Sequence, residues 1–128
     1  MDLEYIARKA LAARQFDQVV GPATFTLRTP TKLDSSIAYA QAMGAAKRDG
    51  SAGLRFERAV ALLAVVGWSG VLVRHVLPEH QGDEPFAFEP GAAEVLFDAQ
   101  PEWEASLLQA LMARIAERQA VEDTAAKN

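Results

Sequence analysis

The sequence predicts a small, mainly α-helical single domain with four to five helices and one or two short β segments. Its length of 128 residues suits one domain. Half of the residues are hydrophobic and 23% are charged, so the chain can bury a core and does not belong to the disordered class. Hydrophobic residues recur at helical spacing in several segments, which glycines and prolines separate.

Residues 1–20 are expected to form an N-terminal amphipathic helix that precedes the main domain. Asp2 is suited to cap its start, and the Gly21-Pro22 pair marks its end. The apolar positions at helical spacing are Leu3, Ile6, Ala7, Ala10 and Leu11.

The main helical domain is expected to span residues 21–119 and to open with a short extended segment at 24–29. In this segment Phe25 and Leu27 alternate with threonines, as in a half-buried strand, and Pro30 closes it.

A second helix is expected to start at a capping box formed by Thr31 and Asp34, and to continue through about residue 43. Its residues expected to face the core are Leu33, Ile37, Tyr39 and Ala40. Residues 44–53, which contain three glycines, are predicted to form a loop.

Residues 54–66 form the most apolar helix candidate, and a helix that is apolar nearly all round is usually central. Gly67 is well placed to end it. Residues 68–71 are predicted to form a compact turn, and residues 72–76 either a short strand or a helical extension.

The polar residues 78–91 are predicted to form a connector in which Phe86 and Phe88 alternate like a short strand. Pro90 suits the first position of a short helix that runs through residues 96–97. Pro101 is expected to start a last helix that ends near Gln119. Residues 120–128 lose the apolar periodicity and are expected to form a flexible C-terminal tail.

Charge is distributed unevenly along the chain. Residues 1–58 carry nine basic and six acidic side chains, whereas residues 59–128 carry four basic and eleven acidic ones. Residues 75–113 contain no lysine or arginine, and this acidic block is a candidate partner-facing surface, although placement at helix starts explains about half of its acids. The overall charge of −4 argues against nucleic-acid binding.

No motif in the sequence supports catalysis, a metal site or a cofactor site. The absence of cysteine excludes thiolate zinc sites and cysteine nucleophiles. His75 and His80 have the wrong spacing for a helical metal site, and no phosphate-binding loop or nucleophile elbow is present. The apolar stretch 59–73 is too short to span a membrane, and the N-terminus carries acids where a signal peptide needs bases, so we expect an unexported chain without a membrane partner.

Two tryptophans are candidates for partner binding. Trp68 lies in a Gly-Trp-Ser-Gly segment, where an indole can act as a large apolar anchor, and Trp103 heads the apolar stripe of the last helix. Core packing is the ordinary explanation for both, and a ridge for a partner helix is the alternative. The candidate residues are Gly67, Trp68, Gly70, Val71, Trp103, Leu107 and Leu111.

Two segments of the chain resemble the small tail assembly chaperones of long-tailed bacteriophages. Residues 25–31 read F-x-L-R-T-P-T, and residues 65–71 read V-x-G-W-x-G-V. The order of the elements is also similar, and the segment Pro-Phe-Ala-Phe-Glu-Pro-Gly-Ala-Ala-Glu at 85–94 departs from the commoner form by having Glu89 in place of serine. The resemblance covers residues 24–115, and its first motif comprises Phe25, Leu27, Arg28, Thr29, Pro30 and Thr31.

The resemblance implies a non-enzymatic protein that binds the tape measure protein and recruits tail tube subunits during tail assembly. It implies action in the host cytoplasm and absence from the finished virion, with no metal and no cofactor. Two other interpretations stay open at this point: a regulatory protein that binds and inhibits a host factor, also as a second role, and a structural tail or neck component. Self-association into a homo-oligomer also stays open.

Overall fold

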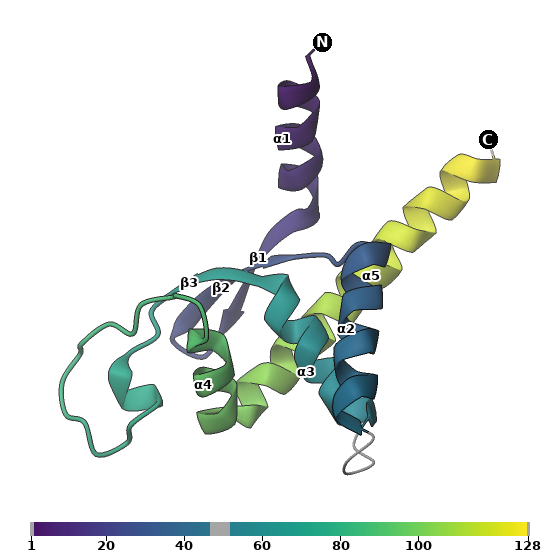
Figure 1. Ribbon diagram of the computed structural model, residues 1–128. Helices are drawn as coiled ribbons and strands as arrows, with labels where there is room; N and C mark the ends of the chain where they lie inside the picture. The colour runs from purple at the N-terminus through teal and green to yellow at the C-terminus, as the bar shows by residue number, and fades with distance from the viewer. Residues whose placement is uncertain (1, 47–51, 128) are drawn as a thin grey trace.

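The computed structural model describes residues 2–46 and 52–127. These residues form five α-helices and a three-stranded antiparallel sheet, and 62% of the chain is helical, which confirms the mainly helical class. Strands β1, β2 and β3 are adjacent in that order. Figure 1 shows α3, α4 and α5 beside the sheet, whereas α1 and the C-terminal end of α5 extend away from the body.

Helix α1, Leu3–Arg14, starts as expected, because the Asp2 carboxylate accepts a hydrogen bond from the Tyr5 amide at 2.7 Å. It ends earlier than predicted, since Gln15–Val20 form strand β1 instead of completing a helix over residues 1–20. This segment pairs along its whole length with β2, Ala23–Arg28, and the pairing outweighs the local helical pattern. The Gly21-Pro22 pair is therefore the turn of a hairpin.

Helix α2, Lys32–Ala46, begins with the predicted capping box. The Asp34 amide donates to the Thr31 hydroxyl at 3.1 Å, and the Thr31 amide donates to the Asp34 carboxylate at 2.8 Å. The expected core face is wrong, because Ala38 and Ala42 are buried. The residues that were expected inside but are exposed are Leu33, Ile37, Tyr39 and Ala40.

Helix α3, Ala52–Ala64, ends before Gly67, and Val65–Ser69 form strand β3. The predicted helix through residue 66, ending at Gly67, is therefore wrong, and so is the predicted compact turn at 68–71. The reason is that the β-branched residues at 65–66 leave the helix and form a strand paired with β2. Of the predicted 44–53 loop, residues 44–46 belong to α2 and 52–53 to α3, and the remainder lies outside the described residues.

The connector after β3 contains one turn of 3₁₀ helix, Val73–His75, and one isolated bridge between Leu72 and Pro85, but no strand at Phe86–Phe88. Helix α4, Ala92–Ala99, begins two residues after Pro90.

The last helix, α5, starts at Pro101 as predicted. It continues to Lys127 rather than ending near Gln119, because alanine and other helix formers sustain it without an apolar face.

The core lies between the sheet and α3, α4 and α5. Phe25 and Leu27 on β2 are almost completely buried, as are Leu96 and Phe97 on α4. A second cluster joins Ala38 of α2 to α3 and α5. Helix α1 contributes no buried residue to either cluster.

Candidate functional site

The two chaperone-like motifs lie side by side in the fold. Residues 25–28 belong to β2 and residues 65–69 to β3, and the two strands pair so that Phe25 lies opposite Trp68. Their rings meet edge to face, with centroids 5.9 Å apart. Segments nearly forty residues apart in the sequence thus form one structural unit.

The polar residues of the first motif belong to a cluster of hydrogen bonds and ion pairs that joins β2 to its neighbours. Arg28 donates through Nε to the Leu63 carbonyl at 3.2 Å and lies 3.5 Å from Asp34. Arg14 donates to the buried Thr29 carbonyl at 2.9 Å and also reaches Asp34. These contacts give the motif a structural role.

Asp34 is at the centre of this cluster. Burial raises the pKa of its carboxyl, but the hydrogen bonds with Thr31 and the nearby Arg28 and Arg14 outweigh burial, so the pKa lies below its ordinary value of 3.8. Asp34 is therefore charged at neutral pH and joins the end of α1, strand β2 and the start of α2.

Trp68 is half-buried in an aromatic cluster that joins strand β3 to the connector that follows it. Its indole N–H donates to the Phe86 carbonyl at 2.7 Å, the Phe86 ring stacks on it, and Phe88 meets it edge-on at 4.9 Å. Phe88 itself is 39% exposed, so the cluster keeps an apolar edge at the surface.

The two glycines beside Trp68 have different roles. Gly70 has a φ of +78°, and a Cβ there would lie 2.5 Å from the Pro22 carbonyl oxygen, so the fold itself requires glycine. At Gly67 φ is not positive, and a Cβ would meet nothing within 4 Å. Gly67 therefore leaves open space over the edge strand β3, where another chain can approach closely.

The remaining candidates for partner binding lie mostly in the core. Val71, Leu107 and Leu111 are each at most 2% exposed. Trp103 is half-buried between Phe25 and His75, with ring centroids 6.2 and 5.0 Å away. Burial, with a smaller contribution from Arg74, lowers the pKa of His75 below its ordinary value of 6.5, and its Nδ1 accepts the Leu72 amide at 2.9 Å.

Comparison with protein families, curated proteins and solved structures finds no match. The functional argument therefore depends on the motifs and on the surfaces that the fold leaves open.

Sequence analysis missed two of these surfaces, which lie on α1 and α2. On α1, Leu3, Ile6 and Leu11 are 82%, 47% and 43% exposed. On α2, the exposed large apolar residues are Leu33, Ile37, Tyr39 and Met43. The periodicity of each segment revealed an apolar stripe, but the stripe faces outward on both helices.

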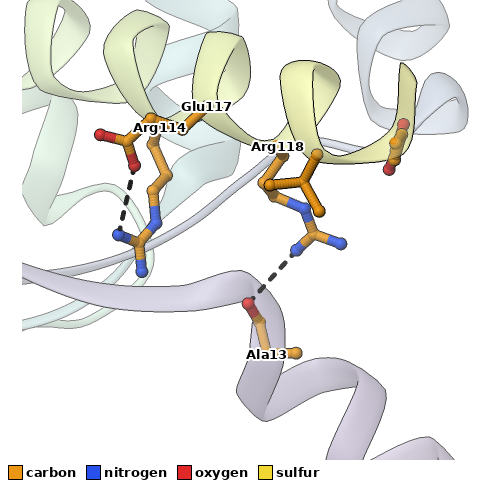
Figure 2. Close-up of a pocket in the computed structure, with 6 residues that line it drawn as sticks. Ala13, Arg114, Glu117 and Arg118 are labelled. Carbon is orange, nitrogen blue, oxygen red and sulfur yellow. Dashed lines mark hydrogen bonds and ion pairs between the residues drawn. The ribbon is translucent and has the colours of Figure 1, made fainter. Parts of the chain in front are cut away.

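A cleft separates the end of α1 from the C-terminal half of α5, and Figure 2 shows Arg118 reaching across it to Ala13. Arg118 donates to the Ala13 carbonyl at 3.2 Å, which satisfies a free carbonyl at the end of α1. Arg114 lies over the Phe16 ring at 4.9 Å and 3.8 Å from Glu117. Arg118 therefore joins α5 to the end of α1, and Arg114 joins α5 to strand β1.

Some carboxylates of the acidic block form ion pairs within the chain. Arg58 of α3 binds Glu104 of α5 with two hydrogen bonds and Asp98 of α4 at 2.8 Å, which ties three helices together. Elsewhere Asp83 pairs with Arg74. At least these carboxylates are explained by contacts within the chain rather than by a partner.

Searches of the described residues for a metal-ligand cluster and for a membrane-spanning helix both find none. Within 2–46 and 52–127, no three metal-ligating side chains come together. None of the helices that the structure describes combines the length and hydrophobicity needed to cross a lipid bilayer.

Proposed function

We propose that this chain is a non-enzymatic tail assembly chaperone of a long-tailed bacteriophage. In this role it binds the tape measure protein in the host cytoplasm, keeps it soluble and recruits tail tube subunits to it. The finished virion does not retain it.

The observation that carries the proposal is an amphipathic helix whose side chains the described part of the chain leaves unburied. Helix α1 has twelve residues, none of them buried, and projects from the body with Leu3 and Ile6 exposed. Isolated helices of this length are marginal in water, so contact with a partner would stabilise α1. An exposed apolar helix face suits a chaperone of a helical client.

The motif geometry supports the same proposal. The two segments that resemble the chaperone family pair as neighbouring strands, and their aromatic residues pack on each other. A resemblance caused by chance would not need to bring the two segments together in space.

Co-expression with the tape measure protein tests the proposal. We expect the tape measure protein to be mostly soluble with the wild-type chain and mostly insoluble without it. The double variant Leu3→Glu/Ile6→Glu should lower the soluble fraction several-fold, because it places charges in the apolar face of α1. Lys9→Glu, which changes charge off that face, should behave like wild type.

Three results would count against the proposal. A tape measure protein that is equally soluble with and without this chain would exclude the chaperone role. Stoichiometric capture of one host protein from uninfected cells would favour the regulatory alternative. Retention of the chain in purified virions would favour a structural component.

A further inference from the structure

Helix α1 and the C-terminal half of α5 are two helical arms that diverge from one joint (Figure 1). At the joint, Arg118 of α5 donates to the Ala13 carbonyl of α1 at 3.2 Å. Beyond the joint, the side chains of residues 2–12 and 119–126 are all exposed. A cleft of about 320 Å³, lined by both arms, lies between them (Figure 2), so the two helices have room to approach each other.

The residues that face outward from the joint occur in the same order on both arms. In a helix, the positions three, four and seven residues from a given residue lie on the same face as that residue. Counted from Ala13 toward the N-terminus of α1, these positions hold Ala10, Lys9 and Ile6. Counted from Arg118 toward the C-terminus of α5, they hold Val121, Glu122 and Ala125.

At equal distances from the joint, a large apolar residue on one arm meets a small one on the other. Val121 lies at the level of Ala10, and Ile6 at the level of Ala125. Val121 is 69% exposed and Ile6 47%, so both have apolar surface left to bury. Because α1 runs toward the joint and α5 away from it, the arms are antiparallel. Alternation of large and small residues allows two such helices to pack closely.

The charges in the middle of the two arms are opposite in sign. Arg8 and Lys9 lie five and four residues from the joint on α1, and Glu122 and Asp123 lie four and five residues from it on α5. At a rise of 1.5 Å per residue, both pairs are about 6–8 Å from the joint along their helix axes. All four side chains are exposed. Approach of the arms therefore brings two bases to two acids rather than like charges together.

The charges at the joint itself do not oppose this approach. Arg114 lies over the Phe16 ring and 3.8 Å from Glu117. Arg14 donates to the Thr29 carbonyl and pairs with Asp34. These arginines are thus already engaged with groups of their own surroundings.

We infer that α1 closes onto the C-terminal half of α5 as an antiparallel helix pair, which covers Ile6 and Val121. The hinge is the junction at 14–15, where α1 ends, because the next residues are fixed by the pairing of β1 with β2. The open and closed arrangements exchange by rotation of α1 about this junction. One consequence rests on the proposed function: the closed arm hides the apolar face of α1, and the open arm offers it to the tape measure protein.

The distance between the arms tests closure in the chain alone. The chain contains no cysteine, so Ala7→Cys and Thr124→Cys provide two sites for spin labels, both off the rows that face each other. Double electron–electron resonance should show a short-distance population in this doubly labelled chain. Val121→Glu should remove that population, because closure would bury its carboxylate without a partner. Ala120→Glu adds the same charge on the opposite side of α5 and should keep it.

Three results of this experiment would overturn the inference. The first is the absence of a short-distance population, and the second is its persistence in Val121→Glu. The third is a short distance between chains that carry one label each, which would place α1 on α5 of a second copy. Circular dichroism of each variant checks that the helices are retained.

Charge reversal provides an independent test of how the arms are matched. Glu122→Lys should lower the closed fraction about two- to fivefold, since it replaces an attraction to Lys9 by a repulsion. The additional change Lys9→Glu should restore the closed fraction, because the pair is then reversed but complementary. A double variant as open as Glu122→Lys alone would overturn the proposed matching of the arms.

The outcomes for closure and for the chaperone role are separable. Val121→Glu leaves the apolar face of α1 intact and open, so it should keep the tape measure protein at least as soluble as the wild type does. If the arms close but neither chain keeps the tape measure protein soluble, the chaperone role is wrong and closure stands. If the short distance is absent while the tape measure protein stays soluble, closure is wrong and the chaperone role stands.

Discussion

Replacement of Asp34 by alanine should destabilise the protein strongly, because this carboxylate joins three elements. It accepts the Thr31 amide at 2.8 Å in the capping box and lies 3.4 Å from Arg14 and 3.5 Å from Arg28. Loss of a capping interaction costs about 1 kcal/mol. The two arginines, whose side chains are 23% and 29% exposed, contribute roughly 0.5–1 kcal/mol each, after allowance for solvent screening.

The free energy of unfolding of Asp34→Ala should therefore fall by about 2–3 kcal/mol, which corresponds to a drop of roughly 10 °C in the thermal midpoint for a chain of this size. Asp34→Asn keeps the shape and one acceptor oxygen but removes the charge, so it should lose about half as much. Urea denaturation followed by circular dichroism measures both. A loss below about 0.5 kcal/mol in the alanine variant would refute the reasoning.

The same carboxylate should make stability depend on pH with a definite sign. The folded-state pKa of Asp34 lies below its ordinary value of 3.8, so its charge stabilises the fold fully above that value. This stability is lost as the pH falls through the lowered folded-state pKa. The difference between wild type and Asp34→Asn should shrink as urea midpoints are measured down to about pH 3. A difference that stays constant would show that charge is not the cause.

Three further outcomes are expected. Gly70→Ala should cost about 2 kcal/mol or more, because the new Cβ would lie 2.5 Å from a backbone carbonyl oxygen. Gly67→Ala, where a Cβ would meet nothing within 4 Å, should leave stability unchanged or slightly raised in thermal unfolding. Arg58→Ala should lower the free energy of unfolding by about 1–2 kcal/mol in urea titrations, because two carboxylates lose their shared partner. Arg74→Ala, which removes an exposed ion pair, should change it by less than about 0.5 kcal/mol. His75 has a folded-state pKa below 6.5, so its contribution to stability is complete above that pH and declines as the pH falls below 6.5. A His75→Gln variant should therefore show a weaker dependence of stability on pH in that range. Identical pH dependence in the variant and the wild type would contradict the lowered pKa of His75.

Local chemistry predicted the starts of elements well. The Asp2 cap, the Thr31–Asp34 capping box and the start of the last helix at Pro101 are all confirmed. Each depends on hydrogen bonds or dihedral angles within a few residues, which the sequence specifies directly.

Pairing between distant segments could not be predicted in the same way. Residues 15–20 and 65–66 fit helical patterns, yet both form strands because β2 lies between them and satisfies their backbone groups. The alternation of Phe25 and Leu27 identified β2 itself, but nothing local identified its neighbours. The Gly21-Pro22 pair predicts a helix end, but it lies between two strands and forms their turn.

The candidate site shows the same division between what is local and what is not. Periodicity located the apolar stripes of α1 and α2 but could not say whether the fold covers them. In α2 the small Ala38 and Ala42 take the buried side, because close helix packing favours small residues, and the larger Ile37 and Tyr39 remain outside.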